Sequence, residues 1–389
     1  MNPLDVLLLA FCVLASLEVS VLFFQTSLKL ARLGVLEAQP ELDSDLPLPS
    51  LSVVIAARDQ ASTLRDTVGS LLRQGYPDLE IVIVDDRSED GTGALVDALA
   101  QESSQVKPVH IEVLPEGWLG KVNALRVGTE RGTGELTLYT DADVVFAPDV
   151  VATAIGSLHR LGLDHLTIMP RIHHASFFHG VFVAALSVLG IWLWVPETFG
   201  EKGSGRSTGF GSFNLVRKAA LDQTAGFAWL KMEVLDDRGL GLLLQQAGFR
   251  GAALLSTGEL SVAWYGSVWE MVQGLEKNLF GGVTGYSFAL AMLHLANVAA
   301  LALGPAVALT SPYVWPLGAL AIAGHVGFSL LAARRLDRSP LSFLLFPVGM
   351  VFVGLALVNS TLSFARHRGI VWRGTRYAAD ALRQGQRVR

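Results

Sequence analysis

Between about Ser50 and Gly258, short apolar runs alternate with segments of helical spacing, and long apolar stretches flank this section on both sides. Four of the short runs have the length and the Val, Ile and Leu content of buried strands: 51–57, 79–84, 109–114 and 135–140. Apolar residues recur at helical spacing in the first intervening segment, 61–74, and we expect further helices at 91–102, 121–131 and 149–161. Strands and helices that alternate in this way favour an α/β fold with a mostly parallel sheet and right-handed crossovers.

Four long apolar stretches lie outside this section: 4–30, 286–309, 313–333 and 341–364. Each is long enough to cross a bilayer core of about 30 Å. The first has neither a basic N-terminal flank nor a small-residue cleavage pattern, so we expect residues 1–34 to be a retained transmembrane anchor. Lys29 and Arg32 follow it, which favours a cytoplasmic position for the next domain. Glu18 within the anchor would need a polar partner.

The C-terminal transmembrane region, 285–364, presents a conflict of topology. Arginines at 334, 335 and 338 mark a cytoplasmic loop, and the arginine-rich tail at 365–389 should also be cytoplasmic. Three complete crossings would put that tail outside. We therefore expect that the stretch 341–364, which contains Pro347, Gly349 and Gly354, bends back as a re-entrant element.

A fifth apolar stretch, 177–196, lies inside the domain that we expect at 51–265. A span there would place the two parts of that domain on opposite sides of the membrane, so we expect an interfacial or buried helix. Residues 35–50 read as a linker and 266–284 as an interfacial segment. Cys12 is the only cysteine, so the fold cannot depend on an intrachain disulfide.

Two carboxylate pairs stand at the C-terminal ends of strand-like runs: Asp85 with Asp86, and Asp141 with Asp143. Open α/β sheets bind ligands just beyond the carboxyl ends of their strands. Mg²⁺ and Mn²⁺ prefer carboxylate oxygens, and alternation along an extended chain would direct the carboxylates of Asp141 and Asp143 to the same side. For segment 85–92, turn formation and helix capping are an equally good interpretation.

Three further segments carry candidate chemistry. Lys121 stands at a helix start, where it could bind phosphate, although an ordinary surface lysine is the alternative. Glycines in 207–214 would let the backbone approach a ligand closely, or would simply make a flexible loop. Asp236 and Asp237 open a helix, where a carboxylate can cap the helix or act as a general base.

Taken in order, five segments resemble the family-2 glycosyltransferases, which are inverting enzymes with a GT-A fold. They are 55–60 (IAARDQ), 85–92 (DDRSEDGT), 120–125 (GKVNAL), 141–143 (DAD) and 236–240 (DDRGL). They are similar, respectively, to the family's P-A-R-N-E opening, its D-D-x-S-x-D-x-T nucleotide motif, its G-K-x-x-A-L segment, its metal motif and its E-D-x-x-L base segment. Ala56, Asp59 and Gln60 depart from the first pattern. The resemblance covers about 51–265.

The apolar ends and segment 372–377 (WRGTRY) resemble the membrane-bound group around ceramide glucosyltransferase and the hopanoid- and carotenoid-type glycosyltransferases. Many membrane members carry Q-x-x-R-W after the base, and this chain does not. Polar and aromatic residues in that neighbourhood could do related work: Trp269, Gln273, Glu276, Lys277 and Asn278. The missing motif argues against a processive polysaccharide synthase.

The resemblance implies that a sugar is transferred in a single displacement from a nucleotide-sugar to a membrane lipid. The nucleotide-sugar that it implies is a UDP-sugar. Asp237, with Asp236, would be catalytic, and Asp143 with Asp141 would hold Mg²⁺ or Mn²⁺. The implied donor-binding residues are Ala57, Arg58, Asp85, Asp86, Lys121 and Asp141. The implied acceptor-side residues are Gly209, Phe210, Gly211, Trp269 and Lys277. We expect no nucleic-acid partner, and we expect a bacterial inner-membrane protein whose catalytic domain is cytoplasmic.

Two other classes of function stay open at this point. A processive synthase that exports a polymer would be distinguished by the length of its product. A non-catalytic membrane scaffold that retains the fold would show no metal-dependent binding of UDP.

Overall fold

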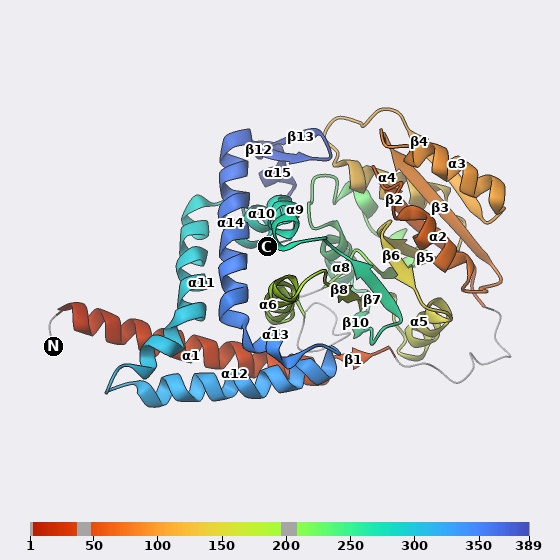
Figure 1. The fold of residues 1–389 in the computed structure, drawn as a ribbon. Coiled ribbons are helices and arrows are strands. Elements are labelled where there is room, and N and C mark those ends of the chain that lie inside the picture. The colour runs from red at the N-terminus through yellow and green to blue at the C-terminus, as the bar shows by residue number, and fades with distance from the viewer. Residues whose placement is uncertain (1–2, 37–47, 196–207, 389) are drawn as a thin grey trace. The chain divides into compact units, whose positions relative to one another are not determined.

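The computed structural model describes residues 3–36, 48–195 and 208–388, which form two compact units (Figure 1). The helical unit comprises Met1–Leu33, His173–Glu197 and Trp264–Ile370. The sheet unit comprises Gly34–Ile172, Thr198–Ala263 and Val371–Arg389. Each unit is therefore assembled from three separate stretches of chain. Most of the linker expected at 35–50 lies outside the described residues.

An eight-stranded sheet forms the centre of the sheet unit. Its strands, in spatial order, are β1 (Gly34–Val35), β10 (Gly251–Leu255), β7 (His165–Met169), β9 (Asn214–Arg217), β5 (Leu136–Thr140), β2 (Leu51–Ala57), β3 (Leu79–Asp86) and β4 (Val106–Ile111). The two pairings of β9 are antiparallel, and the other pairings are parallel. The prediction of a mostly parallel sheet is confirmed.

The helices of the sheet unit are α2 (Leu64–Leu72), α3 (Thr92–Glu102), α4 (Gly120–Arg131), α5 (Val150–Arg160), α7 (Lys218–Leu221), α8 (Asp236–Gln246) and α15 (Ala379–Gly385), with a 3₁₀ turn at Gly226–Ala228. The strand predicted at 109–114 is instead β4, three residues earlier. It is an edge strand with exposed side chains, so its apolar pattern is weak. The remaining strands are β6 (Val144–Phe146), β8 (Arg171–His173) and β11 (Leu260–Ala263), which form a small second sheet, and β12 (Gly369–Trp372) with β13 (Thr375–Ala378), which form a hairpin.

Helix α4 packs very closely on the central sheet. A Cβ atom on Gly128 would lie 2.4 Å from Cγ1 of Val54 and 3.1 Å from Cγ2 of Val84, so only glycine fits between the helix and strands β2 and β3. The valines of these strands are fully buried. This packing fixes the axis of α4 and thereby places its first residues, Gly120 and Lys121, at the carboxyl edge of the sheet.

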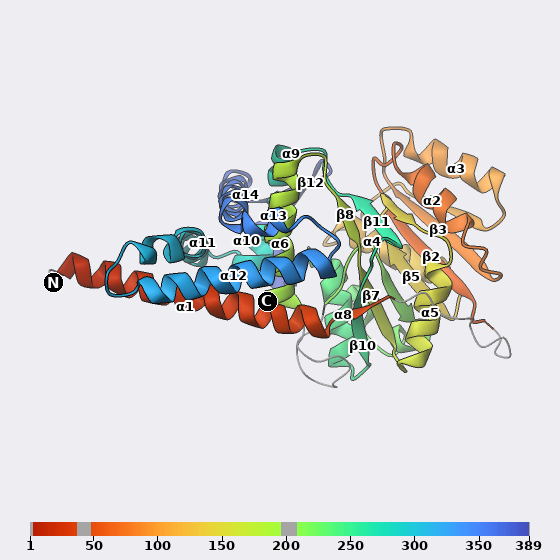
Figure 2. The same ribbon diagram turned by 60° about the horizontal axis from the view of Figure 1, so that its bottom comes forward.

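The helical unit contains α1 (Pro3–Arg32), α6 (Phe177–Trp194), α9 (Val268–Gly274), α10 (Glu276–Thr284), α11 (Phe288–Leu309), α12 (Trp315–Arg335), α13 (Pro340–Leu344) and α14 (Phe346–His367). Helices α1 and α12 run side by side in both ribbon views (Figures 1 and 2). Among the described residues, five helices are long and apolar enough to cross a membrane: α1, α6, α11, α12 and α14. The expected apolar helices at the N-terminus and in the C-terminal region are confirmed.

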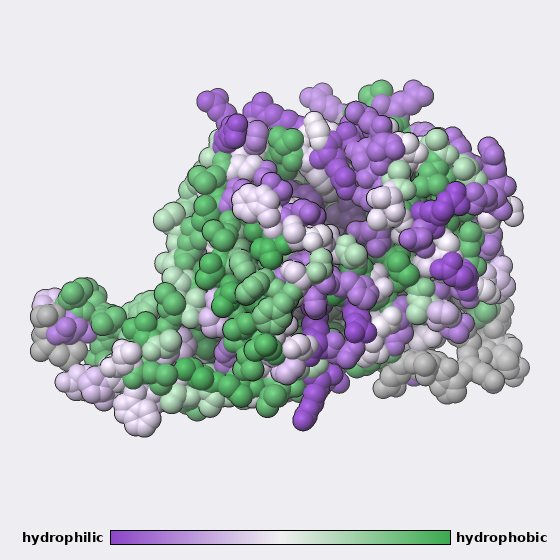
Figure 3. Space-filling model, viewed as in Figure 1, coloured by the Kyte–Doolittle hydropathy of each residue, from purple (hydrophilic) through white to green (hydrophobic). Residues whose placement is uncertain are grey.

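The surface of the helical unit suits a lipid environment. Many large apolar side chains on α1, α11 and α12 are exposed. Examples, with their exposed fractions, are Leu7 (67 %), Phe24 (66 %), Met292 (66 %) and Leu320 (63 %). Figure 3 shows apolar residues gathered over the helical unit, whereas hydrophilic residues are frequent over the sheet unit. So much exposed apolar surface marks a membrane-contacting region.

The stretch 341–364 does not bend at Pro347, Gly349 or Gly354, because α14 is continuous from Phe346 to His367. The break in this stretch lies earlier, at Leu345, between α13 and α14. Pro347 lies in the first turn of the helix, where its missing N–H leaves no hydrogen bond unmade. A Cβ atom on Gly349 would lie 2.6 Å from Cβ of Ala185 and 2.9 Å from the carbonyl oxygen of Val181. The glycine therefore allows close packing of α14 on α6 rather than a bend.

Glu18, inside α1, has the polar partner that its position requires. The side-chain amide of Asn297 in α11 donates a hydrogen bond to the Glu18 carboxylate. This bond satisfies a carboxylate that would otherwise lie unpaired within an apolar helix bundle.

Candidate active site

The two carboxylate pairs lie at the same edge of the central sheet. Asp85 and Asp86 are the last residues of β3, and Asp141 directly follows β5. Only β2 separates these two strands, and it runs parallel to both. Parallel strands bring their carboxyl ends to one edge, so the predicted placement of the pairs at a common edge holds.

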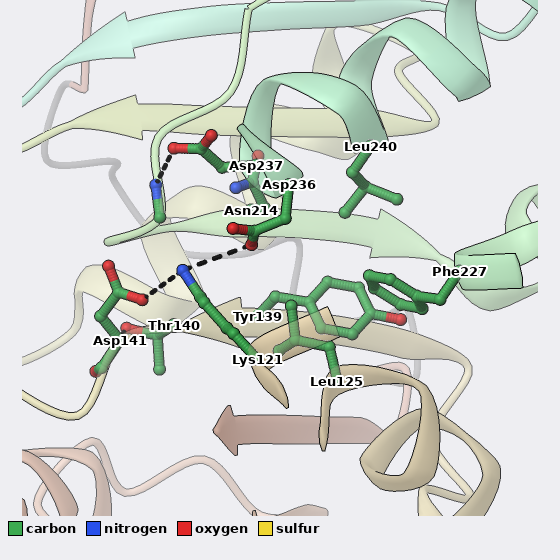
Figure 4. Close-up of a pocket in the computed structure, with 11 residues that line it drawn as sticks. Lys121, Leu125, Tyr139, Thr140, Asp141, Asn214, Phe227, Asp236, Asp237 and Leu240 are labelled. Carbon is green, nitrogen blue, oxygen red and sulfur yellow. Dashed lines mark hydrogen bonds and ion pairs between the residues drawn. The ribbon is translucent and has the colours of Figure 1, made fainter. Parts of the chain in front are cut away.

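A small cleft opens at this edge (Figure 4). It is lined by residues from β5, β9, α4, α8, the 3₁₀ turn and the connecting loops: Lys121, Leu125, Tyr139, Thr140, Asp141, Gly211, Asn214, Phe227, Asp236, Asp237 and Leu240. The apolar residues form one wall, and the lysine and the three aspartates form the other. A cleft with convergent charged groups on one side is suited to a polar ligand.

Lys121 joins segments that are far apart in the sequence. Its Nζ lies 2.8 Å from Oδ1 of Asp141 and 3.3 Å from Oδ2 of Asp236. Burial alone lowers the pKa of Lys121, but the charges of Asp141, Asp236 and Asp237 outweigh burial and raise that pKa above its ordinary value. Lys121 is therefore a charged member of the cleft and not an ordinary surface lysine.

Asp237 stands in the first turn of α8 and faces the cleft. Its Oδ2 accepts a hydrogen bond from the backbone N–H of Gly211 at 2.9 Å, and its Oδ1 accepts one from the N–H of Arg238 at 2.7 Å. Burial, followed by the charge of Asp236, raises the pKa of Asp237 to about 6. A carboxylate with such a pKa is a better proton acceptor than an ordinary aspartate and is still ionised at neutral pH.

The glycine-containing loop contacts both Asp141 and Asp237. A Cβ atom on Gly209 would lie 2.0 Å from the carbonyl oxygen of Asp237, and one on Gly211 would lie 2.5 Å from Oδ2 of Asp141. The backbone N–H of Asp141 also donates to the carbonyl of Gly211 at 3.0 Å. The close approach predicted for this loop is thus an approach to the site's own carboxylates. Phe210, between the glycines, donates its N–H to Oγ1 of Thr167 at 2.9 Å.

Asp143 has features that suit a metal ligand. Its Oδ1 is buried, and no hydrogen-bond donor reaches it within the described part of the chain. Burial, and then the charge of Asp141, raises the pKa of Asp143 to about 6. Strand alternation does not orient this pair as expected, because β5 ends at Thr140 and Ala142 and Asp143 lie in a turn.

The donor set at 141–143 is sufficient for a cation that shares its ligands with a substrate. In residues 3–36, 48–195 and 208–388, no group of three or more His, Cys, Asp or Glu side chains could hold a metal ion. Mg²⁺ commonly takes only one or two carboxylates from the protein and completes its shell with phosphates and water. Asp141 and the unsatisfied Asp143 fit that kind of site.

Asp86 is held by cations beside the start of α4. Arg87 binds its carboxylate through two bonds of 2.8 and 3.0 Å, and Nη1 of Arg58 lies 4.0 Å from Oδ2. A Cβ atom on Gly120 would lie 2.3 Å from Oδ2 of Asp86. The neighbouring Asp85 accepts from the N–H of Ser88 at 3.3 Å and lies 3.3 Å from Nδ1 of His110.

Turn formation, one part of the alternative interpretation of this segment, is seen in its second half, whereas the N-cap of α3 is Gly91, which has no side chain to cap this helix. Oδ1 of Asp90 accepts a hydrogen bond from the N–H of Thr92, and Oδ2 accepts one from the N–H of Ala61, each at 3.0 Å. The N–H of Gln60 donates to Oγ1 of Thr92 at 2.8 Å. Asp90 and Thr92 therefore fix the loop after β2, which begins with Arg58, against the loop after β3.

Some predicted residues belong to the other unit. Trp269 in α9 is 60 % exposed, and Lys277 in α10 hydrogen-bonds Oδ1 of Asn278 at 3.0 Å. Both are part of the helical unit, so they remain predictions for the acceptor side.

Sequence reasoning did not assign the C-terminal tail, which we define as residues 371–388, to this site. Tyr377 accepts a hydrogen bond at its hydroxyl from the N–H of Gly120 at 3.1 Å, and Nη1 of Arg58 donates to Oγ1 of Thr375 at 3.3 Å. The dense aromatic and basic content of 372–377 was the available signal, but nothing in the sequence indicates which part of the chain it contacts.

Residues 52–237 match the family described as Glycosyl transferase family 2. The chain is 28 % identical over 230 residues to the beta-monoglucosyldiacylglycerol synthase of Trichormus variabilis, which covers 57 % of this chain and 47 % of that protein. It is 29 % identical over 174 residues to the poly-beta-1,6-N-acetyl-D-glucosamine synthase of Staphylococcus epidermidis, which covers 44 % of this chain and 40 % of that protein. The chain thus spans about half the length of the curated relatives it matches.

Among solved structures, the mannosyltransferase PcManGT from Pyrobaculum calidifontis, in complex with GDP-Man and Mn²⁺, resembles this fold over most of both chains. The TM-score is 0.53 at 18 % sequence identity, and the match covers 90 % of this chain and 99 % of that one. The predicted GT-A fold is confirmed.

Replacement of Lys121 by Met should destabilise the protein in a pH-dependent way. Three carboxylates would lose their common cation, so we expect the free energy of unfolding to fall by roughly 2–4 kcal/mol at pH 7. This is less than the cost at a fully buried site, because Lys121 is partly exposed. The pKa values of Asp237 and Asp143 lie above the ordinary value of an aspartate, so the ionised forms of these side chains oppose folding. Protonation near pH 5 removes those charges, so the stability lost by Lys121→Met should be smaller at pH 5 than at pH 7.

Thermal unfolding of the detergent-purified protein at pH 5 and pH 7 measures this effect. Lys218→Met is the matched control, because Lys218 makes only an exposed pair with Asp222 at 3.1 Å on the surface of the same unit. Equal losses for the two variants, or a Lys121→Met loss that does not depend on pH, would contradict the expectation.

Proposed function

We propose that the protein transfers a sugar from a nucleotide-sugar to a membrane lipid, because residues 52–237 match Glycosyl transferase family 2. The observation that carries the proposal is the position of Lys121, which is ion-paired with Asp141 and with Asp236. One cation thereby brings the D-x-D segment and the acidic start of α8 to a single cleft. A relative that is named as a glucolipid synthase and the five apolar helices favour a lipid acceptor.

The donor would bind along the carboxyl edge of the sheet. Asp86, with Asp85, would hold the nucleoside through its hydroxyl or imide groups, since carboxylates accept hydrogen bonds from both. Lys121, at the N-terminus of α4, would face the diphosphate, where the charge of the lysine and the helix dipole attract it together. We take UDP as the nucleotide, while the structural relative contains GDP-Man.

Asp143 and Asp141 would hold Mg²⁺ or Mn²⁺. Such an ion, when bound, neutralises the negative charge that develops on the diphosphate leaving group. The buried and unsatisfied Oδ1 of Asp143 is the feature that supports this assignment.

Asp237 would act as the general base. It would accept the proton of the acceptor hydroxyl while that oxygen forms a bond to the anomeric carbon and the bond from this carbon to the diphosphate breaks. The nucleoside diphosphate leaves with the bonding electrons, and one displacement inverts the anomeric configuration. Hydrogen bonds from Gly211 and Arg238 hold the carboxylate in place for this role, and Asp236 raises its basicity.

The sheet unit would lie on the cytoplasmic side. Strands before α6, such as β5 and β7, share one sheet with β9, which follows α6, so a single crossing by α6 would divide the sheet. In the same way, β11 and the C-terminal tail both belong to the sheet unit, so the chain between them must cross the membrane an even number of times.

Helices α11 and α12 would be that pair of crossings, and α14 would begin and end on the cytoplasmic side. Arg335, at the end of α12, donates a hydrogen bond to the carbonyl of Leu33, just after α1. The C-terminal ends of α1 and α12 therefore meet, and each carries basic residues. The positive-inside tendency favours the cytoplasm for both ends.

A processive polysaccharide synthase is the second candidate function. The similarity to a poly-beta-1,6-N-acetyl-D-glucosamine synthase over 174 residues favours it. A product with one added sugar supports lipid transfer, and a long polymer supports the synthase.

Asp237→Asn should abolish transfer while it preserves donor binding. Loss of the base is expected to reduce the rate by a factor of about 10²–10⁴. The assay follows labelled sugar from a UDP-sugar into membrane lipid in a purified preparation. Asp222→Asn, on the exposed surface, should behave like the unaltered protein. Unchanged transfer by Asp237→Asn would rule out this role.

The pH dependence of kcat/KM should show an acidic limb near pH 6. Asp237 must be ionised to accept a proton, and its pKa is raised to about 6, so activity should rise as the pH increases through that value. Saturating Mn²⁺ would keep Asp143 ionised, which leaves Asp237 to define the limb. Activity that is constant from pH 5 to pH 7 would contradict the assignment.

Cysteine labelling tests the topology. In a Cys12→Ala background, Thr310→Cys between α11 and α12 should react with a membrane-impermeant maleimide in intact spheroplasts. Ser339→Cys, after α12, and Gln384→Cys, in α15, should react only after lysis. All three positions are exposed in the structure. Labelling of Gln384→Cys in intact spheroplasts would overturn the cytoplasmic assignment.

A further inference from the structure

The C-terminal hairpin formed by β12 and β13 contacts the start of α4. The hydroxyl of Tyr377 lies 3.1 Å from the backbone nitrogen of Gly120, and this hydrogen bond is buried. Gly120 itself is so close to Asp86 that no side chain would fit there. The hairpin is thus attached between the proposed nucleoside carboxylates and Lys121.

A second contact places the turn of the hairpin beside Arg58. Nη1 of Arg58 donates to Oγ1 of Thr375 at 3.3 Å, and a Cβ atom on Gly374 would lie 3.8 Å from Nη2 of the same arginine. Arg58 also lies 4.0 Å from the carboxylate of Asp86. Two independent contacts therefore locate residues 373–377 at the donor side of the cleft.

The turn has an unusual residue at its first central position. Arg373 has φ 47° and Gly374 has φ 74°, and a two-residue hairpin turn with both φ values positive is of type I′. Glycine or asparagine normally occupies such a position, because a Cβ atom in the left-handed conformation costs about 1–2 kcal/mol.

Arg373 is exposed, and it directly precedes Gly374 and Thr375, which lie beside Arg58 at the donor side of the cleft. Arg373 forms neither a hydrogen bond nor an ion pair with any residue that the structure describes, whereas Arg87 and Lys121 are each bound to carboxylates. Its charge is therefore available to a ligand.

The far end of the tail is fixed as well. The carboxylate of Glu233 accepts hydrogen bonds from the N–H groups of Arg387 at 2.6 Å and Val388 at 2.9 Å. A Cβ atom on Gly385 would lie 2.2 Å from Cβ of Met232, so the backbone packs directly on the segment before α8. With both ends attached to the sheet unit, the hairpin is a fixed part of it.

We propose that Arg373 binds the diphosphate of the nucleotide-sugar, so that the C-terminal hairpin completes the donor site. This inference rests on the proposed function. The cleft contains several aspartates, and an incoming diphosphate adds further negative charge. An arginine can bind two phosphate oxygens at once through its planar guanidinium, which lysine cannot do.

Titration of the full-length protein with nucleotides tests the proposal. Binding of UDP, UMP, GDP and GMP would be measured by calorimetry in the presence of Mn²⁺, for the unaltered protein and for Arg373→Ala. Loss of a charge-assisted contact should weaken diphosphate binding about tenfold to a hundredfold. Monophosphate binding should be nearly unchanged, and kcat/KM for the donor should fall in parallel with the diphosphate affinity.

Arg383→Ala is the matched control. It removes one positive charge from the same tail, but Arg383 lies on α15 and its carboxylate partner is the exposed Asp380 at 3.6 Å. We expect nucleotide binding by this variant to equal that of the unaltered protein. Arg373→Lys, which keeps the charge but not the two-pronged geometry, should regain only part of the diphosphate affinity.

The remaining outcomes separate this inference from the proposed function. If the unaltered protein binds neither UDP nor GDP, both are overturned. If it binds one of them and Arg373→Ala binds that nucleotide equally well, only the role of Arg373 is overturned. Equal weakening of diphosphate and monophosphate binding, or a lower thermal midpoint for Arg373→Ala than for Arg383→Ala, would also overturn it.

Discussion

The ion pairs of Lys121 are the interaction on which the site depends. Asp141 follows β5 and Asp236 begins α8, and these residues are separated by a large part of the domain sequence. Without a cation between them, their carboxylates would repel each other at the edge of the sheet. Lys121 can occupy that position because Gly128, two turns further along α4, lets the helix lie directly on β2 and β3. The geometry of the cleft therefore follows from one lysine and one glycine on the same helix.

Much of the fold could be predicted from the sequence, because its signals are local. The strand at 51–57 is a continuous apolar run and the helix at 121–131 lies between two strand-like runs, and both are present almost to the residue. The edge strand β4 was misplaced because several of its side chains are exposed, and the small second sheet was missed because its strands are very short. The position expected for a bend in 341–364 was wrong. The break lies at Leu345, whereas Gly349 allows close packing of α14 on α6.

The site was predicted only as far as its residues lie on recognisable motifs. Asp141, Asp236 and Lys121 do meet, as their positions at strand and helix ends implied. The contacts of Tyr377 with Gly120 and of Arg387 with Glu233 could not be foreseen, because they join segments whose separation in the chain carries no periodic signal. Long-range hydrogen bonds of this kind depend on the whole tertiary arrangement and not on local propensity.

The interleaved order of the two units has a consequence for biosynthesis. The hydrogen bond between Gly120 and Tyr377 joins residues 257 positions apart, and most of the helical unit lies between them in the chain. At about 5–20 residues per second, a ribosome needs on the order of 10–50 s to make that stretch. During this interval the start of α4 lacks the hydroxyl of Tyr377 as a hydrogen-bond partner. A nascent chain therefore cannot complete its sheet unit until the helical segments have been synthesised and residue 377 has followed them.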